Sequence, residues 1–100
     1  MRIHFERSGG FTGLTLVTTV ESDTLSQQEE QHLRQLLDEA GFFDLPGLLQ
    51  DTTSAVDQFR YTVTVETPGR RHTVEVTDGA VPPPLRPLLQ WLARAARRRT

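Results

Sequence analysis

Hydrophobic and polar residues alternate along four stretches of the chain, which is the pattern of a half-buried β-strand. The run that begins at Met1 and the run from Leu14 to Val20 form a first pair. Residues 59–66 and 72–77 form a second pair, separated by a short turn that contains Pro68. Because each pair is joined by a short connection, we expect two β-hairpins.

Three glycines fall within five positions between the first two runs, in the segment Arg7-Ser8-Gly9-Gly10-Phe11-Thr12-Gly13. A Gly-Gly pair is typical of a hairpin turn that needs positive φ. A tight turn does not need Gly13, a third glycine just beyond the apolar Phe11. Two interpretations therefore stand: the glycines only turn the chain, or the tip is bare backbone that lies against a partner.

Two other stretches have the apolar spacing of an amphipathic helix. The first begins at a Ser-x-x-Glu capping box, Ser26 to Glu29, and ends at Gly41, which we expect to be a left-handed cap. The second follows the rigid run Pro82-Pro83-Pro84 and has its apolar stripe at Leu85, Leu88, Leu89, Leu92 and Ala96, with Trp91 at the edge of the stripe. Both helices therefore have one face to bury.

Two segments lie between the first helix and the third strand. Residues 42–49 are too apolar for a free loop, so we expect them to tuck under the helix end as an irregular or one-turn segment. Residues 50–57 are rich in turn formers and have no period, which predicts a loop.

The element order is therefore ββαββα. This order predicts an α+β open-faced sandwich: a four-stranded antiparallel sheet with both helices on one face and the threonine-rich face toward water. One hundred residues form a single domain, 1–100, with one modest core.

Composition restricts the partners and the compartment. The net charge is −2, and all five charged residues of 85–100 are arginines. Arg94, Arg97, Arg98 and Arg99 are expected at the negative end of the second helix's dipole, and basic charge gathered at this C-terminal tip is not the pattern of a nucleic-acid surface. No apolar run approaches the ~18 residues of a membrane span, no basic-then-apolar leader is present, and there is no cysteine. We expect a cytoplasmic protein that is monomeric when free and has no membrane partner, and the charge balance argues against a nucleic-acid partner.

The residue types of an active site do not come together in the sequence. His4, His32 and His72 stand alone on separate elements, without the spacing of metal ligands. Adjacent acids such as Asp38 and Glu39 point about 100° apart on a helix. Ser8 lacks the Gly-x-Ser-x-Gly setting of a nucleophile. We expect no catalytic residue, no metal site and no cofactor, and so a binding protein rather than an enzyme.

Several segments, in order along nearly the whole chain, resemble one family. They are residues 7–13, residues 57–65, His72-Thr73-Val74, residues 78–82 and the stretch from Leu85 to Leu92. Together they resemble emfourin, the inhibitor family of protealysin-type metalloproteases. The resemblance implies a cytoplasmic proteinaceous inhibitor that binds thermolysin-like (M4) zinc proteases at the active-site cleft.

The predicted path of the chain brings residues 8–13, 50–57 and 79–84 to one end of the sandwich. Glycines let backbone approach a groove closely, prolines limit the entropy lost on binding, and Phe11 or Val81 is a candidate for an apolar subsite. A backbone carbonyl or an Asp carboxylate there is a candidate oxygen ligand for the protease zinc. The predicted contact residues are Ser8, Gly9, Gly10, Phe11, Thr12, Gly13, Thr53, Ser54, Ala80, Val81 and Pro82.

Other interpretations stay open at this point. Phe11 also fits a core or cross-strand aromatic, and Pro82 to Pro84 also fit a rigid entry to the helix. The main alternative function is a protein- or nucleic-acid-binding module that uses the sheet face or the arginine-rich C-terminus. A small enzyme requires His4 and His72 to meet at a common carboxylate or metal.

Overall fold

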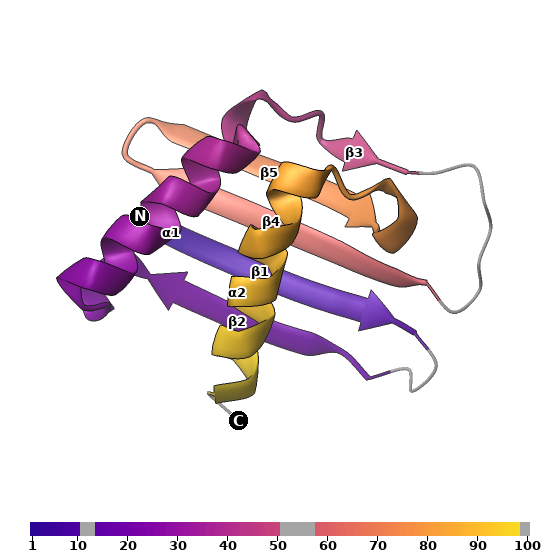
Figure 1. The fold of residues 1–100 in the computed structure, drawn as a ribbon, viewed down its shortest axis with the longest axis horizontal. Coiled ribbons are helices and arrows are strands. Elements are labelled where there is room, and N and C mark those ends of the chain that lie inside the picture. The colour runs from indigo at the N-terminus through magenta and orange to yellow at the C-terminus, as the bar shows by residue number, and fades with distance from the viewer. Residues whose placement is uncertain (11–13, 51–57, 99–100) are drawn as a thin grey trace.

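The computed structural model describes residues 1–10, 14–50 and 58–98 and has an α+β fold (Figure 1). Its strands are β1 (Arg2–Gly9), β2 (Leu16–Glu21), β3 (Leu48–Leu49), β4 (Phe59–Thr67) and β5 (Arg70–Thr77). Its helices are α1 (Gln27–Ala40) and α2 (Arg86–Arg98), and short 3₁₀ turns lie between several of these elements. Both predicted hairpins and both predicted helices are present.

The sheet has five strands in the order β2-β1-β4-β5-β3, so the predicted four-stranded antiparallel sheet was wrong in one respect. The additional strand β3 pairs in parallel with β5, and the Glu75 N–H donates to the Gly47 carbonyl over 2.8 Å. β3 lies within the segment that we expected to tuck under the helix end. Phe42 is buried there as expected, but Leu48 is 57% exposed on the edge strand. Two residues are too few to show an alternating pattern, which is why the sequence did not reveal this strand.

The connection between β1 and β2 is longer than a Gly-Gly turn. The last pair of the β1–β2 ladder joins Arg7 to Leu16, and Leu14 lies before β2 rather than in it. Gly9 instead continues the ladder of β1 with β4, opposite Phe59. Gly9 and Gly10 have φ values of 86° and 77°, which confirms the predicted positive φ.

Both ends of α1 follow the local sequence. The Glu29 N–H donates to the Ser26 hydroxyl at 3.1 Å and so satisfies one of the free amides of the first turn. At the other end Gly41 adopts φ 58° and its N–H donates to the Asp38 carbonyl. The predicted capping box and left-handed cap are confirmed.

Both helices cover the same face of the sheet, as predicted, and α2 runs across the strands (Figure 1). The strands contribute buried residues such as Ile3, Phe5 and Val63, and the helices contribute Leu33 and Leu88 among others. Trp91 is 7% exposed at the edge of the α2 stripe. The opposite face carries polar residues, including the hydrogen-bonded pair of Thr64 and Thr73. No helix within the three described ranges is long and apolar enough to cross a membrane.

Candidate functional site

The C-terminal ends of β1 and β5 and the start of β4 meet at one end of the sheet (Figure 1). Gly9 pairs with Phe59, and the Gly79 N–H donates to Oε1 of Gln58 at 2.6 Å. This hydrogen bond joins the residue before β4 to the 3₁₀ turn Asp78–Ala80 that follows β5. We call this region, Gly9, Gly10, Gln58, Phe59, Gly79 and Ala80, the glycine end of the sheet.

Gly9 and Gly10 are required by packing within the chain as well as by their backbone angles. A Cβ added to Gly9 would lie 2.7 Å from the Gln58 carbonyl oxygen, and one added to Gly10 would overlap the edge of the Phe59 ring. Any larger residue would therefore push β1 and β4 apart or displace the aromatic ring. The bare backbone of these two glycines lies against this chain's own β4.

Arg7 occupies a position on the helix-facing side of β1, two residues beyond the buried Phe5 and four beyond the buried Ile3. Its guanidinium carbon lies 4.4 Å from the centroid of the Phe59 ring, which is a cation–π distance. The Arg7 Nε is buried and has no hydrogen-bond acceptor within the described residues. A cation thus extends a row of side chains that is otherwise apolar.

Tyr61 joins the same cluster from β4. Its hydroxyl donates to Oδ1 of Asp78 at 3.2 Å, and the Arg86 guanidinium lies 3.8 Å from that oxygen. Burial of the Tyr61 side chain, and then the negative charge of Asp78, raise the pKa of the Tyr61 hydroxyl above its ordinary value. The charge of Arg86 is therefore compensated by Asp78 at this end of the sheet.

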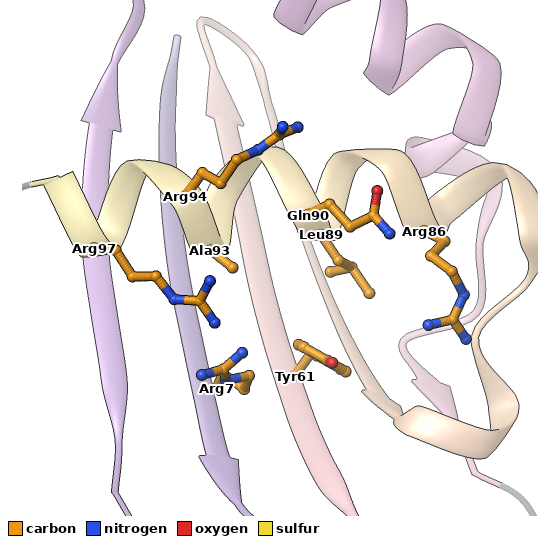
Figure 2. Close-up of a pocket in the computed structure, with 8 residues that line it drawn as sticks. All are labelled: Arg7, Tyr61, Arg86, Leu89, Gln90, Ala93, Arg94 and Arg97. Atoms are coloured by element: carbon orange, nitrogen blue, oxygen red, sulfur yellow. The ribbon is translucent and has the colours of Figure 1, made fainter.

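A pocket of about 290 Å³ lies between α2 and the sheet beside this cluster (Figure 2). Its walls include Arg7 and Tyr61 from the strands and Leu89, Ala93 and Arg97 from α2, and no acidic side chain of the described residues lines it. Figure 2 shows the guanidinium groups of Arg7 and Arg97 pointing toward one another, while the Arg94 side chain points away from Arg7. We call this cavity the arginine pocket.

The structure describes six of the eleven predicted contact residues. Gly9, Gly10 and Ala80 lie at the glycine end, and Ser8 lies beside them, opposite Arg60 on β4. Val81 packs in part against the core, which leaves less of it for an apolar subsite. The Pro82 carbonyl accepts a hydrogen bond from the Leu85 N–H at 2.9 Å, which agrees with a rigid helix entry.

The other five predicted residues, Phe11, Thr12, Gly13, Thr53 and Ser54, lie outside the described residues. Arg7, Phe59 and Tyr61 were not predicted from the sequence as members of one cluster. One feature of the sequence did indicate the position of Arg7. In a strand, every second side chain points to the same face, so Arg7 shares the core-facing side with Ile3 and Phe5.

His4 and His72 lie on opposite faces of the sheet. The His4 Nδ1 is 3.0 Å from the Thr19 hydroxyl on the outer face, and the His72 Nε2 is 2.7 Å from the Leu45 carbonyl on the helix side. The described ranges contain no group of three or more His, Cys, Asp or Glu residues that could hold a metal ion. The condition that we set for a small enzyme is therefore not met by these two histidines.

These features define a small α+β sandwich whose strand ends meet at a braced, glycine-containing end, beside a cationic pocket. Residues 5–93 match the Emfourin family, and the chain belongs to that family. This confirms the resemblance found in the sequence. No curated protein and no solved structure matched the chain.

Proposed function

We propose that this protein is a cytoplasmic, non-catalytic inhibitor of M4-type zinc metalloproteases of the thermolysin and protealysin kind. Membership of the Emfourin family is the observation that carries the proposal. The inhibitory surface is the glycine end together with the connections that leave it, residues 8–13, 50–57 and 79–84. These segments enter the active-site cleft of the protease as a wedge.

The bracing of the glycine end supports this choice of surface. Association costs the entropy of every loop that becomes ordered, so a surface that is already tied together binds more tightly. The hydrogen bond from Gly79 to Gln58 and the pairing of Gly9 with Phe59 tie three strand ends together before any partner arrives. A pre-organised surface also suits tight, stoichiometric inhibition.

The direct test is a titration of a thermolysin-like protease with the purified protein. We expect loss of peptidase activity with an end point near one inhibitor per enzyme. Absence of inhibition of any M4 protease would remove the proposed function.

The contact surface needs substitutions that do not strain the fold. Gly9 and Gly10 are poor choices because their packing against β4 predicts destabilisation. Ser54→Arg and Phe11→Ala change predicted contacts instead. The matched control is Gln28→Arg, which adds the same charge at an exposed position in the first turn of α1. We expect weaker inhibition by Ser54→Arg and Phe11→Ala and unchanged inhibition by Gln28→Arg; three equal inhibition constants would remove the site assignment but not the function.

A further inference from the structure

Gln58 is the residue at which the parts of the glycine end meet. It comes directly before β4, and its side chain and its backbone contact two different neighbours. Its Oε1 accepts a hydrogen bond from the Gly79 N–H at 2.6 Å, which holds the turn that follows β5. Its carbonyl oxygen lies so close to Gly9 that a Cβ on that glycine would be 2.7 Å away. One residue therefore contacts both the end of β1 and the turn after β5.

The next residue extends the contact with β1. Phe59 pairs with Gly9 in the ladder between β1 and β4, and a Cβ on Gly10 would overlap the edge of the Phe59 ring. The guanidinium carbon of Arg7 lies 4.4 Å from the centroid of the same ring. The dipeptide Gln58-Phe59 therefore restricts the path that the chain takes as it leaves β1.

The turn Asp78–Ala80 has a second anchor that does not involve Gln58. The Tyr61 hydroxyl donates to Oδ1 of Asp78 at 3.2 Å, and the Arg86 guanidinium at the start of α2 lies 3.8 Å from the same oxygen. These contacts hold the turn to the helix side of the fold, whereas Gln58 holds it to the end of β1. A variant without the Gln58 acceptor should therefore fold, with the turn less fixed relative to Gly9.

The hydrogen bond between Gly79 and Gln58 contributes little to the stability of the whole fold. It lies at the exposed surface, where water can take the place of a lost partner. Its effect on binding is different, because a surface whose parts are already held in one arrangement loses less entropy on association. The side chain of Gln58 should therefore affect binding more than folding.

We propose that Gln58 is a positioning residue of the inhibitory surface, which fixes the turn Asp78–Ala80 relative to Gly9 and Gly10 before the protease binds. Gln58 acts through these neighbours and lies just outside the predicted contact segments. The inference rests on the proposed function and adds to it the residue that keeps two of the contact segments in one arrangement.

Three variants of the whole protein test this role in the inhibition of a thermolysin-like protease. Gln58→Met keeps the length of the side chain and removes the acceptor, so we expect an inhibition constant at least about tenfold higher. Gln58→Glu keeps an oxygen that accepts from the Gly79 N–H and should stay within about threefold of the wild-type value. The matched control is Ser26→Ala, which also removes a side-chain acceptor of a backbone N–H, at the start of α1, and should leave the inhibition constant unchanged.

A second measurement follows the arrangement itself in the free protein. Backbone amide order parameters from NMR relaxation report how tightly each residue is held. In Gln58→Met we expect lower order parameters at Gly79 and also at Gly9 and Gly10, and in Ser26→Ala we expect wild-type values at all three. A change confined to Gly79 would show that Gln58 does not couple the turn to β1, and would overturn the positioning role.

Failure of this role and failure of the proposed function give different results. A wild-type protein that inhibits no M4 protease would remove the proposed function and the role of Gln58 with it. Inhibition by the wild type with an equal inhibition constant for Gln58→Met would remove only the role of Gln58. An equal loss in Gln58→Met and Gln58→Glu would show that the hydrogen-bond acceptor is not the cause, which would also overturn this role.

Discussion

The guanidinium of Arg7 lies 4.4 Å from the centre of the Phe59 ring, across the neighbouring strands β1 and β4. Gly10 lies against the edge of the same ring. One aromatic side chain therefore contacts both the cation that lines the arginine pocket and the glycine backbone of the proposed inhibitory end. Phe59 is therefore a structural support for both features.

The Arg7–Phe59 contact should be measurable as a coupling free energy. In a double-mutant cycle with Arg7→Met and Phe59→Leu, we expect a coupling of about 0.5 to 1 kcal/mol, the usual size of a partly exposed cation–π pair. Urea unfolding of the four proteins measures it. A cycle that pairs Arg34→Met with Phe59→Leu is the control and should give no coupling beyond about 0.3 kcal/mol. The same small value for Arg7 would contradict the assigned contact.

Gly9→Ala should destabilise the protein more than Gly69→Ala. Both glycines have φ near 87°, so both variants carry the left-handed penalty of about 1 to 2 kcal/mol. Only at position 9 would the new Cβ also meet a backbone oxygen at 2.7 Å, while nothing lies within 4 Å at Gly69. We expect an additional loss of at least about 1 kcal/mol in the free energy of unfolding for Gly9→Ala. Equal losses would show that the contact of β1 with Gln58 is not tight.

Ser26→Ala should lower the free energy of unfolding by about 1 kcal/mol, because it removes the acceptor for the Glu29 N–H at the start of α1. Chemical denaturation followed by helix circular dichroism measures the change. Gln28→Ala, at an exposed position of the same turn, is the control and should change stability by less than about 0.5 kcal/mol. If the two variants lose the same amount, the cap is not the cause.

The titration of Tyr61 should make the protein less stable at high pH. The pKa of the Tyr61 hydroxyl is raised in the folded state. At a pH between the unfolded value of about 10 and the folded value, the hydroxyl is therefore deprotonated in the unfolded chain but still protonated in the folded chain. The stabilisation is therefore complete below pH 10 and is lost as the pH rises through the folded pKa. Tyr61 is the single tyrosine of the chain, so phenolate absorbance follows it directly.

The control for this prediction is Tyr61→Phe, measured by urea unfolding between pH 9 and 11. This variant should lack the loss of stability that the titration of Tyr61 causes at high pH. Asp78→Asn should bring the absorbance midpoint back toward about 10, because it removes the negative charge beside the hydroxyl. A midpoint of the wild-type protein at or below 10 would contradict the interaction.

Local patterns were sufficient for most of the elements. The alternation of apolar and polar residues predicted β4 and β5. The leucine stripe and Ser26 predicted α1 and its first turn, and Gly41 predicted where α1 ends. These signals act within a few residues, where the covalent chain itself fixes which side chains share a face. Two hairpins and two amphipathic helices can bury their apolar faces in only a few ways. The packing of both helices on one face of the sheet could therefore be predicted as well.

The sequence by itself determined both hairpins, both helices, their arrangement in two layers and the family. Only the tertiary structure decided that β3 adds to β5, that Gly10 lies against Phe59, and that Arg7 and Arg97 line one pocket. Each of these is a contact between residues far apart along the chain. Such contacts depend on the order of the strands and on where α2 crosses them, and no periodic pattern encodes either.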